Sequence, residues 1–403
     1  MAYGRLLFMK ITDLKVWVTV PERSSVDGSP SGRSYVFLRV DTDEGISGFG
    51  EATSSGGGGS IVVGNMIKFL RNSTAERDFR ETIIGENPEH TELIWHKLFR
   101  RFTGGGGFGG FVTTMLSGID IALWDIKGKA AGKPIYEILG GGPLREEIEL
   151  YTHVAPGDPI KAASEAKMLA KQGFKALKTD PFMPEMRQHH RKYMQGSISP
   201  EGAALAIETI SAIREGVGKN IDILIDCHGN FDVPTAIAMA RKLEPFHIGW
   251  YEEPVQPNSN QALKHVKESV SVPICVGERL YTRWDFIPVL KDRLAEFLMP
   301  DILWTGGISE FYKIANLAES FYVPVSPHDA SGPINIMAGA HTMMTVPNFY
   351  KLEFNHAQLD SHNSLIDRPL DIVDGKLKMS EKPGLGIELD VEFIEAHLDE
   401  DWN

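Results

Sequence analysis

Six short apolar stretches in the second half of the chain each end on a charged side chain, at a nearly constant spacing. The closing residues are Asp226, Glu252, Glu278, Asp301, His328 and Glu353, so the intervals are 26, 26, 23, 27 and 25 residues. A short strand, a loop and a helix need about that many residues, so the spacing predicts repeated βα units. Parallel strands joined by right-handed crossovers expose their C-terminal ends on one side. The pattern therefore predicts a closed α/β barrel with these six side chains gathered at one end.

Two further strands are predicted upstream of this series, one of them over residues 174–179. It contains Lys178, which precedes Asp226 by 48 residues, nearly twice the usual interval. The excess predicts an insertion, which we place at residues 181–199, on the side where the charged strand ends gather. Residues 141–368 are therefore predicted to form the barrel domain.

The insertion contains two adjacent histidines, His189 and His190. Adjacent side chains point in different directions, whereas metal ligands have to converge on one ion. We therefore expect this pair to lie at the surface or in a subunit contact rather than in a metal site.

Residues 1–140 follow a different pattern, in which strands come first and helices follow. Period-two alternation predicts three strands and indicates an antiparallel meander, at 11–20, 34–40 and 46–50. A period of about 3.6 residues predicts helices at 61–70, 88–102 and 113–131. The last helix carries an apolar stripe wide enough to bury against a neighbour, formed by Met115, Ile119, Ala122 and Ile126. We expect an α+β domain that ends near the glycine-rich segment Gly140–Pro143.

Three segments of this first domain are rich in glycine, serine or proline: Pro21–Gly32, Gly56–Gly59 and Gly104–Gly107. Such a composition predicts mobile loops. A phosphate-binding loop is only weakly indicated, because no apolar strand precedes the string GGFGG and no GKS or GKT follows it.

The C-terminal segment, residues 369–403, breaks the βα rhythm. The string LDIVDGKLKM has the pattern of a short hairpin around an Asp-Gly turn, and residues 390–398 have that of a short helix. Neither element needs to belong to the barrel, so we treat the segment as a third part of the chain.

The charge balance excludes some classes of function. The chain has 41 basic and 54 acidic side chains and a pI of about 5.5, which argues against a general affinity for nucleic acid or anionic membranes. No apolar run reaches the roughly twenty residues of a membrane span, and the start of the chain lacks the apolar region of a signal peptide. The two cysteines, Cys227 and Cys275, both fall in predicted strands, which suits a reducing compartment. We expect a cytoplasmic enzyme.

Three successive strand ends carry carboxylates, Asp226, Glu252 and Glu278. Oxygen-only ligands suit a hard cation, and Mg²⁺ usually leaves coordination positions to water or substrate. Each carboxylate alone could pair with a lysine or arginine, but three at a uniform interval favour a metal site. Only one residue of the doublet Glu252–Glu253 can point inward, so we assign Glu252 as the ligand and expect Glu253 to face neighbouring polar groups. We expect one Mg²⁺ per subunit.

Asp301 and His328 end the next two strands and are therefore neighbours around the barrel. A carboxylate that orients an imidazole and stabilises its protonated form makes a competent general base. The alternative is a buried histidine satisfied by a backbone carbonyl. His228, two residues beyond Asp226, emerges on the same face of its strand and is a second acid or base candidate. Glu353 could bind substrate or neutralise a nearby cation.

Several motifs surround these residues. They are Asp226-Cys-His228, Trp250-Tyr-Glu252-Glu253-Pro254, Gly277-Glu278-Arg279, Pro300-Asp301, Pro327-His328-Asp329, Lys382-Pro-Gly-Leu-Gly386 and Ile119-Asp-Ile-Ala-Leu-Trp-Asp125. The series resembles the mandelate racemase-like branch of the enolase superfamily, and most closely its galactonate-dehydratase-type acid-sugar dehydratases. The resemblance covers nearly the whole chain.

This resemblance implies a modified TIM barrel, (β/α)7β, with an α+β N-terminal capping domain that the C-terminal tail completes. It implies that two loops of the capping domain, Pro21–Gly32 and the first glycine tract, close over the barrel. It also implies a histidine or lysine base, with Mg²⁺ stabilising an enediolate.

One motif departs from the family pattern. Racemases of this branch carry Lys-x-Lys at the end of the second strand, with the second lysine as a base, whereas this chain has Lys178-Thr179-Asp180. Only the histidine side is then equipped to abstract a proton, which favours a one-face reaction such as syn elimination over racemisation. Lys178 and Asp180, together with Glu353 and Arg279, are candidates for holding the substrate.

The resemblance implies Mg²⁺-dependent dehydration of a sugar acid, such as galactonate or gluconate, to a 2-keto-3-deoxy acid. His328 would remove the proton at C2, and His228 would protonate the departing 3-hydroxyl unless His328 itself returns the proton.

Two alternatives stay open. One is a racemase or epimerase with Asp180 or His228 as the opposing base. The other is a non-catalytic sugar-acid binder, against which the His328–Asp301 pair argues. The sequence does not name the sugar or the oligomeric state, although the family implies a homo-oligomer.

Overall fold

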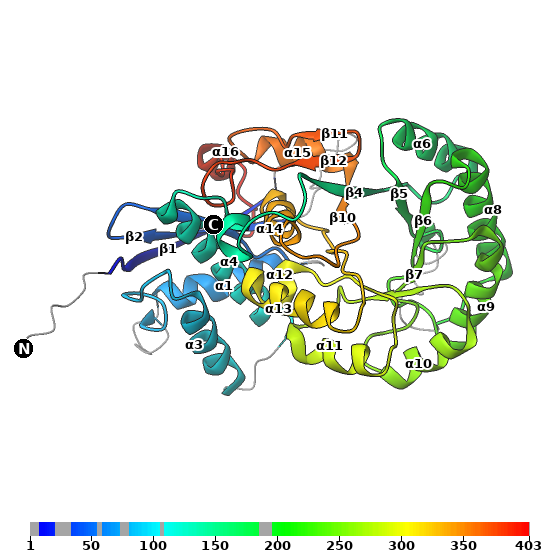
Figure 1. Cartoon of the computed structure of the whole chain (residues 1–403), viewed down its shortest axis with the longest axis horizontal. Coiled ribbons are helices and arrows are strands. Elements are labelled where there is room, and N and C mark those ends of the chain that lie inside the picture. Colours follow the sequence, from blue (N-terminus) through cyan, green and yellow to red (C-terminus); the bar gives the residue numbers. More distant parts are fainter. Residues whose placement is uncertain are drawn as a thin grey trace, which may run out of the picture.

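The computed structural model of the chain describes residues 8–20, 34–54, 59–72, 80–104, 109–184 and 196–402. A three-stranded sheet with its helices forms one side of the molecule, and a ring of helices around parallel strands forms the other (Figure 1). The predicted loop Pro21–Gly32, most of both glycine tracts and the pair His189–His190 lie outside the described residues. Among the helices of the described part, none is long and apolar enough to cross a membrane.

The N-terminal part is built on the predicted antiparallel meander. Its strands pair in chain order: β1 (Ile11–Thr19), β2 (Tyr35–Thr42) and β3 (Ser47–Glu51). The three helices also follow as expected: α1 (Gly59–Asn72), α3 (Thr91–Gly104) and α4 (Phe111–Ala131). Their apolar faces and one face of the sheet share a buried core.

Helix α4 is buried along almost its whole length. Its predicted apolar stripe packs in the core of the N-terminal part, through Met115, Ile119, Ala122 and Ile126. Its other face, through Ile121 and Trp124, belongs to the core of the barrel. Gly50 lets β3 lie directly on this helix, since a Cβ there would stand 1.9 Å from the carbonyl oxygen of Gly118. Helix α4 therefore joins the two parts of the molecule.

The second part is a closed parallel barrel, as predicted. Its paired strands are β4 (Glu147–His153), β5 (Ala176–Thr179), β6 (Asp222–Asp226), β7 (Trp250–Glu252), β8 (Ile274–Val276), β9 (Phe297–Leu298) and β10 (Leu352–Phe354). Strand β10 returns to β4 and closes the ring. Between β9 and β10 the expected strand is reduced to isolated bridges, in which Val325 pairs with Leu298 and Phe349.

Helices alternate with these strands and form the outer ring of Figure 1. Within the described residues, the long helices of this ring are α6 (Pro159–Lys171), α8 (Pro200–Val217), α9 (Val233–Leu243), α10 (Asn260–Ser269), α11 (Thr282–Lys291), α13 (Gly307–Glu319) and α14 (Pro333–Met343). Shorter helices are α5 (Ile135–Leu139), η1 (Glu244–Phe246), α12 (Ile302–Thr305), η2 (His356–Gln358) and α15 (Leu359–Ser364). The strand and helix order is that of a (β/α)7β barrel.

The interior of the barrel is filled by one apolar layer, which forms the floor of the site. This layer consists of Tyr151, Ala176, Leu224, Trp250, Cys275 and Met299. Side chains alternate along a strand, so residues two positions further on also point inward. These residues are His153, Lys178, Asp226, Glu252 and Asp301. The polar site therefore stands one layer above the apolar floor.

Two buried carboxylates of the N-terminal part hold the starts of two barrel helices. Asp120 accepts hydrogen bonds from the backbone N–H and the hydroxyl of Ser309 in α13, at 2.9 and 2.6 Å. Glu51 accepts from the backbone N–H groups of Gly332 and Asn335 at the start of α14, at 2.7 and 3.1 Å. A helix N-terminus leaves backbone donors unpaired, and these carboxylates satisfy them. Burial raises the pKa of both carboxyls to about 7, although the hydrogen bonds oppose the rise.

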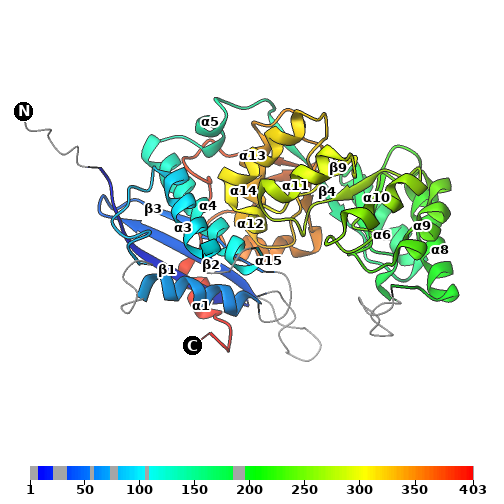
Figure 2. The same ribbon diagram turned by 90° about the horizontal axis from the view of Figure 1, so that it is seen from below.

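The C-terminal segment divides between the two parts. The predicted hairpin forms from β11 (Ile372–Val373) and β12 (Lys376–Lys378), but β12 pairs with β4 and so extends the barrel sheet. The reason is that β10 covers only the second half of β4, which leaves the backbone of its first residues free to pair. Helix α16 (Val391–Ala396) and the residues after it lie against the N-terminal part (Figure 2). The domain boundaries after 140 and 368 stay a prediction.

Trp402 anchors this returning tail. Its side chain is buried, and Lys68 Nζ lies 3.5 Å from the centroid of its ring. Gly64 of α1 leaves room for the ring, because a Cβ there would stand 2.7 Å from it. The tail is therefore part of the core of the N-terminal part and not an appendage.

We expect Trp402→Ala to lower the free energy of unfolding by about 3 kcal/mol, because it empties a closely packed position. Urea denaturation followed by circular dichroism would measure the change. Trp284→Ala is the matched control: this tryptophan of α11 is 44% exposed, so its loss should cost about 1 kcal/mol or less. Equal losses for the two variants would contradict the structural role given to the tail.

Candidate active site

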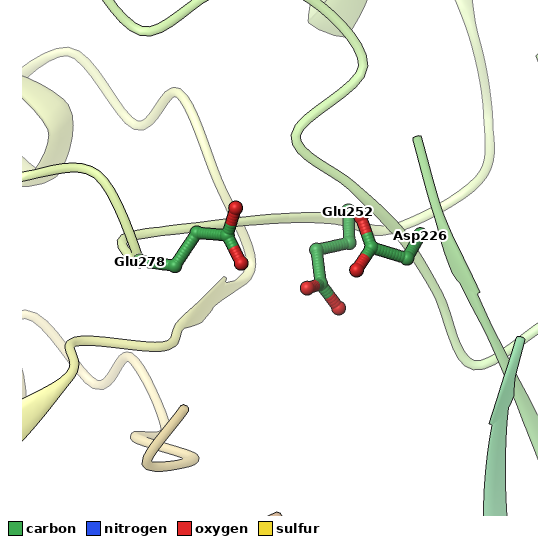
Figure 3. A group of neighbouring side chains, drawn as sticks. All are labelled: Asp226, Glu252 and Glu278. Atoms are coloured by element: carbon green, nitrogen blue, oxygen red, sulfur yellow. The ribbon is translucent and has the colours of Figure 1, made fainter. Parts of the chain in front are cut away.

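Asp226, Glu252 and Glu278 converge at the C-terminal ends of neighbouring strands. Each offers one oxygen, and these three atoms lie within 4.8 Å of one another. Figure 3 shows the three carboxylates directed into the same space. All three are buried, so their charges are poorly screened and need a cation nearby. The donor set suits a hard divalent cation, with further positions left for water or substrate.

A turn at Gly277 brings Glu278 into this cluster. Glu278 stands three positions beyond the inward-facing Cys275, one more than alternation along a strand allows. Gly277 accommodates the change with a φ of 146°, and a Cβ there would lie 2.8 Å from the carbonyl carbon of Met299. Glu253 points elsewhere and accepts a hydrogen bond from the Gly277 N–H at 3.1 Å. The second carboxylate of the doublet therefore supports the loop that carries Glu278.

His328 and Asp301 form a buried pair at one end of the cluster. His328 Nδ1 lies 2.7 Å from Oδ2 of Asp301, and its Nε2 lies 3.0 Å from Glu278. Burial alone would lower the pKa of His328, but the carboxylates of Glu353 and Glu278 raise this pKa well above its ordinary value. The ring also packs against Trp304, with the centroids 5.2 Å apart. These contacts fix the imidazole with Nε2 toward the cluster.

A second histidine–aspartate pair lies at the Asp226 end of the cluster. His228 Nδ1 lies 2.7 Å from Asp180, and its Nε2 lies 3.3 Å from Asp226. Burial lowers the pKa of His228, but Asp226 and Asp180 outweigh it and raise the pKa to about 9. The His228 side chain is 29% exposed, against 6% for His328. His228 is therefore the histidine that is more open to water and to a ligand.

The backbone at His228 makes this placement possible. Its φ of 48° is left-handed, and its N–H donates a hydrogen bond to Asp226 at 2.8 Å. A non-glycine residue in this region is uncommon and marks a position that the surroundings hold in place. The turn sends the imidazole back over the strand end, beside the carboxylate cluster.

Lys178 lies among the carboxylates as their nearest counter-charge. Its Nζ lies 2.9 Å from Glu252, 2.6 Å from Glu353 and 3.5 Å from Asp226. Burial would lower the pKa of Lys178, but these carboxylates raise it well above the ordinary value. The side chain also borders the cavity described below. Its expected contact with a substrate carboxylate stays a prediction, and the same ammonium already offsets part of the negative charge of the cluster.

Glu353 is held by protein groups on both of its oxygens. Oε1 lies 2.6 Å from Nε2 of His153, and Oε2 accepts a hydrogen bond from the N–H of Asp329 at 3.1 Å. With Lys178 also at 2.6 Å, the carboxylate has little capacity left for a ligand. The geometry favours a supporting role over the substrate contact expected from the sequence.

Arg279 also supports the site from outside the main cavity. Its Nη2 lies 2.9 Å from Glu278, and its Nη1 donates to the carbonyl of His228 at 2.7 Å. The side chain lines a separate hollow with Gln256 and Tyr281. The guanidinium thus braces Glu278 against the turn at His228.

A cavity of about 450 Å³ lies beside these groups. Its walls include Lys178, Asp180, Asp226, His228, His328 and Glu353. Among the wall residues that the sequence analysis did not assign are His153 and Asp329. His153 was recoverable from strand alternation, and Asp329 directly follows His328 in its motif. The volume is in the range of small-molecule sites, which run from about 300 to 1,000 Å³.

Comparisons with known proteins agree with this fold. Residues 161–393 match the family model for enolase C-terminal domain-like proteins. Residues 10–140 match that for the N-terminal domain of mandelate racemase and muconate lactonizing enzyme. The chain belongs to the mandelate racemase/muconate lactonizing enzyme family of the enolase superfamily, which confirms the resemblance seen in the sequence.

Individual relatives extend over nearly the whole chain. D-xylonate dehydratase of Haloferax volcanii is 32% identical over 385 residues, which cover 94% of this chain and 89% of that protein. D-galactonate dehydratase of Variovorax paradoxus is 31% identical over 395 residues, covering 96% and 94%. A solved member of the enolase superfamily from Salmonella Typhimurium is 32% identical, with a TM-score of 0.85 over 96% of this chain and 98% of that one.

We expect Asp226→Asn, Glu252→Gln and Glu278→Gln each to weaken divalent-cation binding by at least about tenfold, because each removes one anionic donor at constant volume. Calorimetric titration with Mg²⁺ would measure the affinity. Glu253→Gln is the matched control, since its amide oxygen can still accept the Gly277 N–H, and its affinity should stay within about threefold. Wild-type affinity in all three ligand variants would exclude this metal site.

Proposed function

We propose that the protein is a Mg²⁺-dependent dehydratase of sugar acids, which removes the C2 proton and the C3 hydroxyl to give a 2-keto-3-deoxy acid. The proposal rests above all on the His328–Asp301 pair beside three converging carboxylates. A binding protein would need the cation and polar contacts, but not a buried imidazole oriented by a carboxylate. The relatives named as xylonate and galactonate dehydratases support this substrate class.

The donor set fits Mg²⁺, because three buried carboxylates and no nitrogen or sulfur ligand make up the cluster found in the described residues. Asp226, Glu252 and Glu278 would hold one ion per subunit. When bound, Mg²⁺ would offset the negative charge that develops on the substrate carboxylate as the C2 proton leaves. Lys178, which borders the cavity, would add a second positive charge at this place.

His328 is assigned as the general base. Its Nδ1 faces Asp301, so Nε2 is the atom available to take the C2 proton. Asp301 then stabilises the imidazolium that forms. When the Glu278 carboxylate has no other partner, it stabilises a proton on the same Nε2. A Glu278 engaged as a metal ligand supports it less, so the ligand role of Glu278 prepares His328 to act as a base.

His228 is assigned as the general acid. Hydroxide is a poor leaving group, and proton transfer to it contributes about 10²–10⁴ in rate. Asp180 supports a proton on the imidazole of His228, and the exposure of the ring lets it exchange protons with water. Asp180 holds the ring from the Nδ1 side, as Asp301 holds His328.

The His228–Asp180 pair also supports a second candidate, epimerisation of a hydroxy acid. Inversion at C2 needs a proton acceptor on one face and a donor on the other, and the two pairs stand at opposite ends of the cluster. The same two histidines could serve that reaction without loss of water. The products separate the two candidates.

A library of sugar acids incubated with Mg²⁺, and in parallel with EDTA, tests the proposal. A dehydratase releases a 2-keto acid that semicarbazide detects, and EDTA abolishes the release. An epimerase gives a C2-inverted acid with solvent deuterium and no keto acid. Binding by calorimetry without either product would leave a sugar-acid binder and overturn both enzymatic candidates.

The two histidines should respond differently to substitution. We expect His328→Asn to lose both dehydration and exchange of the C2 hydrogen with D₂O, because the other positioned histidine, His228, stands at the opposite end of the cluster. We expect His228→Asn to lower the rate of dehydration by a factor of about 10²–10⁴, while slow exchange of the C2 hydrogen continues. Proton NMR in D₂O follows both events, and retained Mg²⁺ binding in each variant is the control. Near wild-type dehydration by His228→Asn would refute its role as acid and leave a mechanism with His328 alone.

A further inference from the structure

The cavity extends beyond the groups assigned to the reaction. One part of its wall holds Lys178, His228 and His328. Another part comes from the ends of β4 and β10 and from the loops that follow these strands, and it includes His153 and Asn355. The proposed reaction uses the substrate carboxylate, the C2 hydrogen and the C3 hydroxyl. The hydroxyls from C4 onward have no partner among the residues assigned so far.

His153 and Asn355 are neighbours at the mouth of the barrel. Strands β4 and β10 run in parallel, with Glu353 opposite Tyr151. The backbone of Asn355 is still extended, so two steps further along this register Asn355 comes opposite His153. Tyr151 points into the barrel, and side chains alternate along a strand. His153 and Asn355 therefore both point inward, one layer above Tyr151 and Glu353.

His153 has one ring nitrogen bound by the protein and one left over. Nε2 lies 2.6 Å from Oε1 of Glu353, and an ionised carboxylate can only accept, so Nε2 carries a proton. Nδ1 has no partner among the residues that the structure describes. The side chain is 34% exposed and lines the cavity, so the ring is open to a ligand. In a neutral imidazole, Nδ1 is then a hydrogen-bond acceptor.

Asn355 is divided in the same way. Its Oδ1 accepts a hydrogen bond from the N–H of Ala357 at 3.1 Å, which fixes the orientation of the amide. Its Nδ2, which can only donate, has no partner within the described part of the chain. The side chain is half-buried in the cavity wall. The two strand ends therefore offer a ligand one acceptor and one donor, each on a side chain that the protein already holds in place.

An acceptor beside a donor matches a hydroxyl, because a hydroxyl can donate and accept at the same time. A second carboxylate fits less well. Glu165 belongs to the same wall, where its Oε2 accepts a hydrogen bond from the N–H of Ala155 at 2.9 Å, and its charge would repel another anion. Lys178 is the one lysine or arginine among the described residues of the wall, and it lies at the reacting end.

We propose that His153 and Asn355 together bind one hydroxyl of the sugar acid beyond C3, and that they select an aldonate over a dicarboxylic sugar acid. This inference rests on the proposed function and adds recognition of the polyol chain to it. The hydroxyl donates to Nδ1 of His153 and accepts from Nδ2 of Asn355. Such a subsite discriminates against a molecule that lacks the hydroxyl, because its own polar atoms are then left unpaired.

The experiment uses the best aldonate of the library and its monodeoxy analogues at each position from C4 onward. His153→Gln keeps an amide donor for Glu353 and removes Nδ1, and Asn355→Ser keeps an oxygen for the N–H of Ala357 and removes the amide donor. We expect each to lower kcat/KM for the aldonate by about 3–10-fold, the usual worth of a neutral hydrogen bond. For the one analogue that lacks the bound hydroxyl, each variant should match the wild type within about twofold.

His153→Asn is the matched control, because its shorter amide reaches the place of Nδ1 but not Glu353. It should keep the wild-type ratio of kcat/KM between the aldonate and that analogue, even where both values fall. If His153 only supported Glu353, the result would be reversed. His153→Gln would then keep its activity, and His153→Asn would lose activity equally with the aldonate and every analogue.

Equal losses for the aldonate and all its analogues in either His153→Gln or Asn355→Ser would overturn the proposal. A wild type that prefers the dicarboxylic acid of the same configuration would overturn it as well. If the wild type converts no sugar acid, the proposed function fails separately, and calorimetric binding of the same panel in Mg²⁺ decides the matter. Weaker binding of the aldonate by both variants, with no difference for one analogue, supports the contact. Unchanged binding by the variants, or no binding by the wild type, removes it.

Discussion

Repulsion among buried carboxylates is the constraint on which the mouth of this barrel depends. Three carboxylate oxygens lie within 4.8 Å of one another, which costs at least about 3 kcal/mol per pair even at an effective dielectric constant of about 20. The protein offsets this cost with Lys178 and with two histidines whose pKa values rise beside the carboxylates. Neither His228 nor His328 is therefore an independent acid or base. A cation held by the three carboxylates would compete with these protons for the same negative charge. Cation binding and proton transfer would therefore be coupled.

The rest of the fold holds this balance in place. Alternation along the strands puts the charged residues one layer above an apolar floor, and the turn at Gly277 adds Glu278 to them. The N-terminal part also supports the site, because Asp120 and Glu51 accept hydrogen bonds from backbone N–H groups at the starts of α13 and α14. Helix α14 follows the segment that carries His328, and α13 follows Asp301 after the short helix α12. The N-terminal part thus supports the His328–Asp301 pair through the backbone of the barrel helices, and it also covers one side of the barrel.

The sequence predicted the features that follow from backbone periodicity. The interval of about 26 residues and the alternation of side chains placed Asp226, Glu252 and Asp301 correctly at one end of a barrel, and the motifs identified the family. The contacts of long side chains were not predictable in this way. Arg279 and Glu353 have several rotamers, and their partners come from strands that meet only when the barrel closes. The pairing of the C-terminal hairpin with β4 was also missed, because it depends on how much of β4 its parallel neighbour leaves uncovered. The assigned chemical roles of these site residues stay predictions.

Helix α4 has a consequence for how the molecule moves and evolves. Its two faces belong to two different cores, so Ile121 and Trp124 are as much a part of the barrel as of the domain that contains them. A rigid swing of the N-terminal part away from the barrel would bring this apolar seam into water. A ligand therefore has to enter through movements of smaller elements, while the apolar contact between α4 and the barrel stays closed. For the same reason a barrel expressed without its first 140 residues would present an uncovered apolar face, and the natural unit for recombination or engineering in this protein is the whole chain rather than either half.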